Sequence, residues 1–413
     1  MTKNKEENFN FWAFPSGIRL VHCPTLSHIA YTGIMVGAGS RDEEPAENGM
    51  AHFIEHALFK GTTSRSAKQI INHIENVGGE INAYTTKEET AFYAATLPEH
   101  IGRTMQLLAD MVFHPAFPKD ELLKERQVIY DEIESYNDSP SELIYDDFEN
   151  LLFDGNALAR PVLGTPRTLR YFTPDKARRF VTETYAPDRM VIFVLAPLPF
   201  AKIKALAEKY FADTPYNNTH VRTRITPANF APATASFHRH THQTHVMLGG
   251  LAYPLGHERQ LALYLLNNIL GGGAMNSRLN MRIREQKGLV YTVESQYTPL
   301  SDTGYWSIYF ASDPENREQC IDLIHDELRR FCAKPLSSAA LHRALTQLRG
   351  QMAVAAENKE NMSLAMAKQV LYNGQAATWQ STLRQMEAFS PAFLLDTARQ
   401  VFTSSPLTLL QYL

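Results

Sequence analysis

The sequence predicts an α+β fold in two similar domains, and three observations lead to this prediction. Strands with alternating apolar residues occur in neighbouring pairs, as in residues 80–96, and segments with helical periodicity lie beside them. Residues 214–230 contain two prolines and show little periodicity, so they predict an interdomain linker. The order of strands and helices then starts again. We therefore predict one domain at residues 1–213 and a structurally similar one at 231–413.

The first domain follows from local patterns. A capping box at Ser66 and Gln69 starts one helix, and Gly78 and Gly79 end it. Pro115 separates two further helices. The predicted strands are 17–22, 29–36, two within 80–96, and 189–196; the predicted helices are 48–60, 66–77, 99–113, 118–136, 141–153 and 174–185.

The second domain shows a similar rhythm in a stretch of similar length, which suggests a structural duplication. The predicted strands lie near 245–251 and across 291–312; the predicted helices are 258–270, 274–286, 315–332, 337–357 and 361–372.

Bulk composition excludes several classes of protein. The chain has 413 residues, of which 44% are hydrophobic and 20% charged, as in ordinary globular proteins. A formal net charge of -4 gives no reason to expect a nucleic-acid partner. No apolar run reaches the roughly 18 residues of a membrane span, and the polar start lacks the order of a secretory signal. The three cysteines show no CxxC spacing, so we expect a cytoplasmic, bacterial-type protein without a disulfide framework.

The predicted helix at 48–60 carries His52, Glu55 and His56, which share one helix face. Two imidazoles at this spacing can bind one zinc ion, and a third protein ligand leaves one position open for water. A neighbouring carboxylate can then take the proton of that water. This H-x-x-E-H arrangement is the reverse of the commoner H-E-x-x-H. The alternative is an amphipathic helix that carries two histidines by chance.

The segment 119–134 is rich in candidates for the third ligand. Glu125 and Glu132 are two helical turns apart and share a face. Val128 and Ile129 lie between them, so we expect this face to be buried, where paired carboxylates need a cation. Periodicity alone leaves open which of the two binds the metal. The other carboxylates are expected on a solvated face: Asp120, Glu121, Asp131 and Glu134.

With these residues in order, the sequence resembles the pitrilysin-type zinc peptidases, closest to the branch of mitochondrial processing peptidase and its bacterial relatives. In that family a glutamate ligand follows HxxEH by about 75 residues, and Glu132 lies 76 positions after His56. The resemblance implies that His52, His56 and Glu132 bind one zinc ion per chain and that Glu55 is the general base. It also implies that Glu125 orients a ligand or balances charge.

The segment 78–86, GGEINAYTT, resembles the GGxxNAxT segment of the same family. There it forms an edge strand to which the backbone of the substrate adds as an extra strand. The resemblance therefore implies that Asn82 and Ala83 bind substrate. A plain junction between a turn and a strand is the alternative.

The second half carries a glycine-rich turn at 271–273, followed by Arg284 and Tyr291, seven residues apart. No GK[ST] follows the glycines, which argues against a phosphate-binding loop. The family has a similar turn and a similar Arg/Tyr pair, which reaches the substrate near the scissile bond. A guanidinium and a phenol can hydrogen-bond a peptide carbonyl and stabilise the developing oxyanion. A salt bridge at a helix end and a core tyrosine form the alternative.

A local excess of histidines departs from the family pattern. Period-two spacing puts His238, His240 and His242 on one strand face, and His245 follows. A solvated strand face is the favoured interpretation, and a second metal site is the alternative.

The resemblance also implies an architecture and an activity. Each domain is expected to be a mainly antiparallel sheet packed with helices, and two chains are expected to enclose a chamber. Both motif sets lie on one chain, which favours a homodimer whose sites are completed in trans. The predicted function is a zinc-dependent endopeptidase acting on peptides or unfolded segments. The alternative is a non-catalytic assembly or peptide-binding subunit of the same fold.

Overall fold

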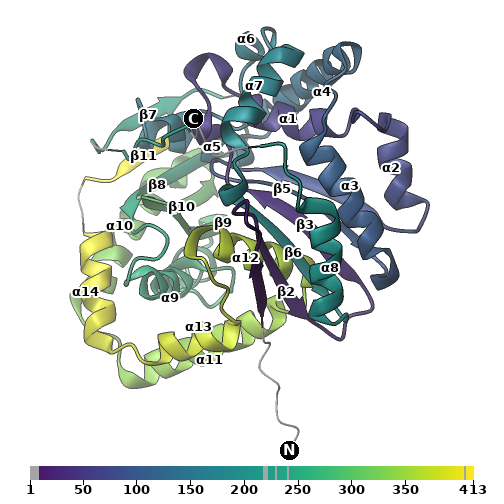
Figure 1. Ribbon diagram of the computed structural model, residues 1–413. Helices are drawn as coiled ribbons and strands as arrows, with labels where there is room; N and C mark the ends of the chain where they lie inside the picture. The colour runs from purple at the N-terminus through teal and green to yellow at the C-terminus, as the bar shows by residue number, and fades with distance from the viewer. Residues whose placement is uncertain (1–8, 217–221, 228–229, 240, 404–405) are drawn as a thin grey trace, which may run out of the picture. The chain divides into compact units, whose positions relative to one another are not determined.

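The computed structural model describes residues 9–216, 222–227, 230–239, 241–403 and 406–413 (Figure 1). The chain folds into two compact units, and each unit combines three separate stretches of sequence. Unit 1 comprises Met1–Glu134, Arg160–Ile225 and Ala355–Thr378; unit 2 comprises Ser135–Ala159, Thr226–Val354 and Trp379–Leu413. Each unit is built around one sheet, which confirms the predicted α+β fold.

The sheet of unit 1 has six strands, and only the neighbours β2 and β6 run parallel. Its strands, in spatial order, are β1 (Asn10–Ala13), β2 (Arg19–Pro24), β6 (Met190–Ala196), β3 (Ala30–Val36), β5 (Thr90–Thr96) and β4 (Glu80–Thr85). The central strand β6 is fully buried, with Ile192 and Val194 in one core and Val191 and Phe193 in the other. Apolar residues at every position of a strand require cover on both faces of its sheet.

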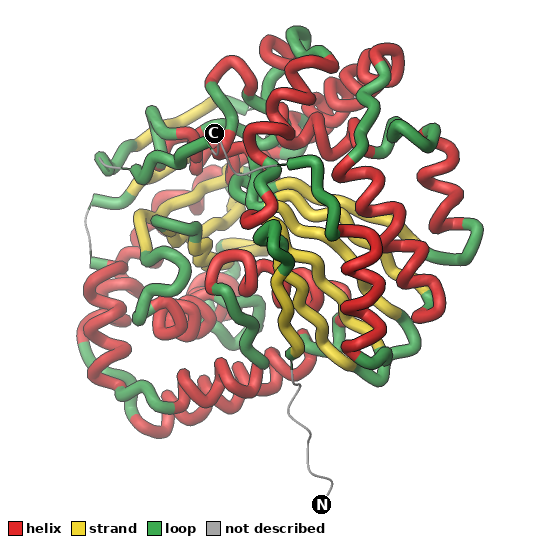
Figure 2. Tube along the Cα trace, in the orientation of Figure 1, coloured by secondary structure: helices red, strands yellow, loops and turns green. Residues whose placement is uncertain are grey.

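Helices cover both faces of this sheet, and Figures 1 and 2 show α3 and α8 lying along it. The core on this face includes residues from α1 (Met50–Leu58), α2 (Ala67–Glu75), α3 (Ile101–Phe113), α4 (Lys119–Asn137), α6 (Pro166–Leu169), α7 (Pro174–Thr184) and α8 (Phe200–Phe211). The opposite face is covered by α12 (Lys359–Asn373), which comes from the C-terminal half of the sequence. The first sheet therefore depends on a helix far away in the chain.

Unit 2 repeats this plan. Its five strands, in spatial order, are β7 (Thr234–Phe237), β11 (Thr408–Tyr412), β8 (Thr244–Ala252), β10 (Gly304–Ser312) and β9 (Val290–Pro299). Only β7 and β11 run parallel. Without the edge strand β1, the two sheets have the same order and the same strand directions. This correspondence confirms the predicted similarity of the domains.

The second sheet also has helices on both faces. One core includes residues from α9 (Gln260–Gly271), the π-helix η6 (Asn280–Glu285), α10 (Arg317–Ala333), α11 (Ser338–Ala355), α13 (Trp379–Glu387) and α14 (Pro391–Phe402). The other face packs on α5 (Pro140–Leu152), which comes from the N-terminal half. Tyr305 and Tyr412 fix α5 there, since their hydroxyls donate at 2.7 Å to Glu149 and Asp147. Thus α5 precedes the predicted linker in sequence but packs in unit 2, and α12 follows the linker but packs in unit 1.

The remaining helical segments are single 3-10 turns. They are η1 (Ser40–Asp42), η2 (Pro45–Glu47), η3 (Pro98–His100), η4 (Ala157–Ala159), η5 (Pro187–Arg189) and η7 (Pro314–Asn316). Among the described residues, no helix is long and apolar enough to cross a bilayer.

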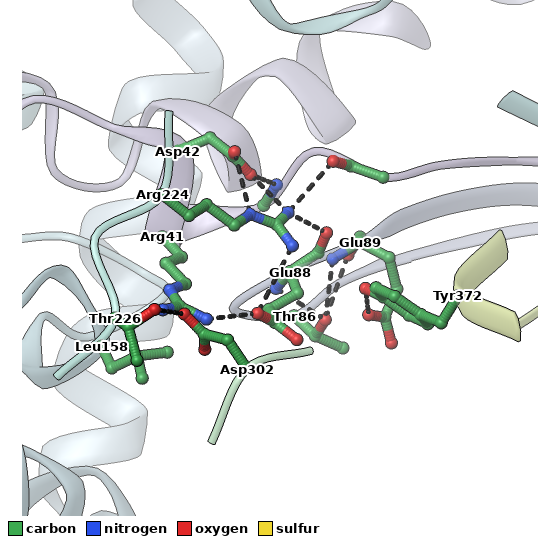
Figure 3. Close-up of polar contacts among 12 residues, drawn as sticks. Arg41, Asp42, Thr86, Glu88, Glu89, Leu158, Arg224, Thr226, Asp302 and Tyr372 are labelled. Carbon is green, nitrogen blue, oxygen red and sulfur yellow. Dashed lines mark hydrogen bonds and ion pairs between the residues drawn. The ribbon is translucent and has the colours of Figure 1, made fainter. Parts of the chain in front are cut away.

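The described part of the predicted linker includes an arginine that is anchored in unit 1. Arg224 donates to the carboxylate of Asp42 at 2.8 Å and to the carbonyl oxygens of Glu88 and Gly37 at 2.7 and 3.0 Å (Figure 3). The Asp42 side chain is fully buried and also meets Arg189 at 2.9 Å. Buried charges of this kind are stable only while each keeps its partners.

Replacing Arg224 with methionine is expected to lower the free energy of unfolding by about 3–5 kcal/mol, because it removes one partner of a buried ion pair. Urea denaturation followed by circular dichroism measures the change. Arg167→Met is the control, since Arg167 is exposed on α6 and should change stability by less than about 0.5 kcal/mol. Equal stability of the two variants would show that Arg224 does not anchor the linker.

Candidate metal centre and peptide-binding strand

The HxxEH residues lie on α1, which is held by its apolar face. Phe53, Ile54 and Leu58 are buried in the first core of unit 1. Their burial fixes the rotation of the helix. His52 and Glu55 therefore project together from the remaining face, as the helical spacing predicts.

The start of α1 is also fixed. Gly49 precedes the helix with a φ of 94°, and a Cβ there would lie 2.7 Å from the Cα of Gly164, so only glycine fits. The buried carboxylate of Glu43 accepts hydrogen bonds from the backbone N–H groups of Gly49 and Ala51, at 2.9 and 2.8 Å. The Glu43 side chain thereby satisfies two free N–H groups of the helix start, while burial raises its pKa to about 8.

Three side chains converge above α1. His52 and His56 present their Nε2 atoms to Glu132 of α4, each 3.7 Å from a carboxylate oxygen. One ligand atom from each residue lies within 4.8 Å of the others, and within the described residues this is the only such group of three. Tetrahedral zinc with bonds near 2.1 Å spaces its ligands about 3.4 Å apart, so the arrangement fits the ion with small shifts.

The protonation state of His52 also suits a metal ligand. Burial, and to a lesser degree the neighbouring His56, lowers the pKa of His52 to about 3, so its imidazole is neutral at pH 7. Its buried Nδ1 has no hydrogen-bond partner among the described residues. A neutral imidazole offers a lone pair to a metal, and Glu132 adds a negative charge.

Glu125 lies on the other side of His56. Its Oε2 is 3.1 Å from His56 Nδ1, and its Oε1 is 2.7 Å from Lys60 Nζ. A proton on Nδ1 is thereby held by a carboxylate, which leaves Nε2 free to bind a metal. The structure separates the two candidate carboxylates: Glu132 faces both Nε2 atoms, and Glu125 orients a ring.

The prediction that Glu125 and Glu132 share a buried helix face is only half correct. The Glu125 side chain is 8% exposed, whereas that of Glu132 is 42% exposed. Ile129 is buried, but Val128 is 47% exposed. Glu132 is therefore accessible to solvent, whereas Glu125 is not.

Replacing Glu125 with glutamine is expected to weaken zinc binding by about 10–100-fold, the usual cost of losing a group that orients a ligand. The neutral amide of the glutamine cannot balance the positive charge of Lys60. Competition with a chromogenic chelator measures the affinity. The control is Glu134→Gln on the same helix, since Glu134 is exposed to solvent. An unchanged affinity in Glu125→Gln would contradict the orienting role.

Glu55 has one recorded hydrogen-bond partner among the described residues. The hydroxyl of Thr85, the last residue of β4, donates to Glu55 Oε2 at 2.7 Å. Burial raises the pKa of Glu55, and the Thr85 hydroxyl opposes this shift. A carboxylate beside the metal ligands and held on one oxygen can act as a general base.

The predicted substrate strand is an edge strand. In its sheet β4 pairs only with β5, with Asn82 opposite Tyr93 and Ala83 opposite Phe92. Ala83 packs against the first core, while Asn82 is exposed. The second side of β4 thus has backbone groups that no strand of the described sheet pairs with, as addition of an extra strand requires.

The predicted Arg/Tyr pair lies in unit 2. Arg284 belongs to the π-helix η6, and its guanidinium lies over the ring of Tyr291, 5.6 Å from the centroid. Tyr291 is 78% exposed at the start of β9, so it is not the core tyrosine of the alternative. Arg284 Nε also lies 3.7 Å from a carboxylate oxygen of Glu285, so the helix-end salt bridge of the alternative is present.

The histidine excess does not assemble into a metal group within the described residues. His245 Nδ1 lies 2.9 Å from the hydroxyl of Tyr309. His238 and His242 are exposed, but they lie between β7 and β8, so the predicted strand face is wrong for them. His240 lies outside the described residues.

Two contacts at the site were not predicted. Lys60 follows His56 by four residues, so helical spacing alone could have placed it on the same face. Thr85 belongs to the NAxT segment, but its contact with Glu55 joins residues 30 positions apart. Only the packing of α1 against β4 brings it there.

Known proteins similar to this chain share its plan. Residues 22–166 match the family described as Insulinase (Peptidase family M16), and residues 171–348 match the one described as Peptidase M16 inactive domain. An uncharacterized zinc protease of Bacillus subtilis, YmxG, is 34% identical over 94% of both chains. The chain belongs to peptidase family M16. Another M16 relative, an uncharacterized zinc protease of Rickettsia bellii, is 31% identical over 97% of this chain and 96% of its own.

Solved structures show the same fold. A peptidase M16 inactive domain from Pseudomonas fluorescens superimposes with a TM-score of 0.90 at 20% identity, over 98% of both chains. A protease from Helicobacter pylori gives a TM-score of 0.88 at 20% identity, over 98% of this chain and 99% of its own. The candidate ligands and Glu55 all fall within the stretch that matches the first M16 description, 22–166.

Proposed function

We propose that this M16 chain is a zinc-dependent endopeptidase that cleaves peptides or unfolded segments. The observation that carries the proposal is the convergence of His52 and His56 of α1 with Glu132 of α4, with ligand atoms within 4.8 Å of one another. Glu55 lies on α1 beside them. The names of its relatives as zinc proteases support the choice of metal.

The residues of the site have separate tasks in this proposal. His52, His56 and Glu132 would hold zinc, and a bound zinc ion polarises a carbonyl and makes water nucleophilic at neutral pH. Glu125 holds the His56 ring in the tautomer that binds a metal. Glu55 takes the proton of the attacking water and passes it to the nitrogen of the leaving amine.

Substrate binding is assigned to β4 and to the Arg/Tyr pair. The peptide backbone adds to the free edge of β4 at Asn82 and Ala83, which orients the scissile carbonyl with little sequence selectivity. Arg284 and Tyr291 donate hydrogen bonds to a peptide carbonyl and stabilise the oxyanion that develops there.

The test is metal analysis of the purified protein together with digestion of a mixed peptide library. About one zinc per chain and cleavage within peptides are expected. Stoichiometric zinc without cleavage would favour the alternative, a non-catalytic assembly or peptide-binding subunit. The intact set of metal ligands and Glu55 favours the enzyme.

We also propose that the protein is a cytoplasmic homodimer with an enclosed chamber, in which Arg284 and Tyr291 of one copy serve the metal of the other. Both motif sets lie on one chain, which supports the sharing. The three cysteines, Cys23, Cys320 and Cys332, are buried thiols, as suits a reducing compartment.

Mixing Glu55→Gln with Tyr291→Phe chains tests the sharing. Each variant alone is expected to be nearly inactive. If sites are completed in trans, half of the randomly mixed dimers carry one intact site, and the mixture regains about a quarter of wild-type activity. The measurement is cleavage of a fluorogenic peptide after subunit exchange. No recovery, although exchange is shown by labelled chains, would exclude sites shared in this way.

A further inference from the structure

Thr85 stands where the proposed substrate strand meets the proposed base. Along β4, Ile81 and Ala83 pack against the core that contains α1, and strand alternation puts Thr85 on the same face. Its hydroxyl reaches Glu55 Oε2 at 2.7 Å. The strand that pairs with the substrate backbone therefore also touches the general base.

The contact distinguishes the two oxygens of Glu55. Oε2 accepts the proton donated by the hydroxyl of Thr85, and Oε1 has no recorded partner among the described residues. Oε1 is therefore the oxygen left available to take the water proton and to carry it to the leaving amine. A hydrogen bond to one oxygen restricts rotation of the carboxylate and keeps the same oxygen available for both transfers.

The position of Thr85 is itself fixed, because the turn after β4 is held by buried ion pairs. Glu88 meets Arg41 at 2.6 Å, with both side chains almost fully buried. Glu89 accepts from the hydroxyl of Tyr372 at 2.5 Å (Figure 3). It also accepts from Lys368 Nζ at 2.5 Å. Lys368 and Tyr372 belong to α12, so the helix contributed by the C-terminal half holds the turn next to Thr85.

We propose that Thr85 is a positioning residue that aligns Glu55 from the substrate-binding strand. The inference rests on the proposed peptidase activity and deepens it: β4 does not only bind the peptide, it also sets the orientation of the base. Pairing of a peptide with the free edge of β4 holds the strand, and through Thr85 the base, in one arrangement relative to the scissile carbonyl.

The test is the steady-state kinetics of Thr85→Val, an isosteric change that preserves β-strand propensity and removes only the hydroxyl. We expect kcat to fall by about tenfold to a hundredfold, since general-base catalysis loses part of its alignment. KM, bound zinc and melting temperature should stay close to those of the wild type. Thr85→Ser restores the donor and should recover kcat to within about threefold.

Two controls make the result specific. Thr96→Val removes a buried hydroxyl from the neighbouring strand β5, where it meets Thr104 at 3.5 Å, and should leave kcat unchanged. In a double-mutant cycle, Thr85→Val should have no further effect on the residual rate of Glu55→Gln, because the aligned base is already absent.

An unchanged kcat in Thr85→Val, a change in KM alone, or failure of Thr85→Ser to recover the rate would each overturn the inference. Loss of zinc or of folding in Thr85→Val would assign the hydroxyl a structural role and overturn it too. These outcomes differ from failure of the proposed function, in which the wild-type protein itself would not cleave peptides.

Discussion

Replacing Glu55 with glutamine is expected to lower the rate of peptide cleavage by about a hundredfold to ten-thousandfold, the range for loss of a general base. Glutamine has the same shape and can still accept the hydrogen bond from Thr85, but it cannot take a proton from water. Zinc should stay bound, because Glu55 is not among the three ligand side chains that converge.

The measurement combines kcat for a fluorogenic peptide with zinc content from the same preparation. Glu75→Gln is a matched control, since Glu75 is exposed at the end of α2. This variant should cleave the peptide at the wild-type rate. If Glu55→Gln cleaves as fast as this control, the proposed mechanism is wrong.

Replacing Glu132 with glutamine is expected to abolish both zinc binding and cleavage. It removes the negative ligand that lies 3.7 Å from the Nε2 atoms of His52 and His56. A neutral amide oxygen is a poor ligand for zinc in a site that otherwise has two neutral imidazoles. The zinc affinity should fall by more than about a hundredfold, beyond the effect of residues that only orient a ligand.

Zinc content after dialysis against a weak chelator measures the change, with added zinc to test for partial recovery of cleavage. Glu134→Gln, two residues further along α4 and exposed, is the control and should keep its metal. Full zinc occupancy in Glu132→Gln would transfer the ligand role to another carboxylate. The Glu55 and Glu132 variants together separate loss of the base from loss of the ion.

Most helices and central strands could be predicted from local pattern. The expected helix at 99–113 corresponds to α3 (Ile101–Phe113), and the expected strand at 29–36 to β3 (Ala30–Val36). The strands β1, β7 and β11 and the helices α6, α8, α13 and α14 were not predicted. The three strands have only four or five residues, too few for a clear alternation, and they are strands because a neighbour pairs with them. The helix predicted at 274–286 is too long, because only the π-helix η6 at its end and the two residues before it are helical.

The candidate site could likewise be predicted only in part from local pattern. The spacing of His52, Glu55 and His56 fixes their common face, because one helix determines their relative directions. The roles of Glu125 and Glu132 could not be separated by spacing, since two full turns put both on one face. The structure distinguishes them because their surroundings differ: Glu125 is buried beside Nδ1 of His56, whereas Glu132 is 42% exposed and faces the Nε2 atoms of His52 and His56.

The sequence by itself determined the α+β class of this M16 chain and the common face of His52, Glu55 and His56, because both depend on contacts within one helix or between adjacent strands. Glu132 lies on another helix and joins them only in the tertiary structure. Only the tertiary structure decided which sheet each helix covers. Periodicity shows that α5 and α12 each have an apolar face, but the partner of that face lies more than 75 residues away in sequence. Burial of apolar surface is non-directional, so an apolar face does not specify its partner. Only the complete fold shows that α12 packs on the first sheet and that Thr85 contacts Glu55.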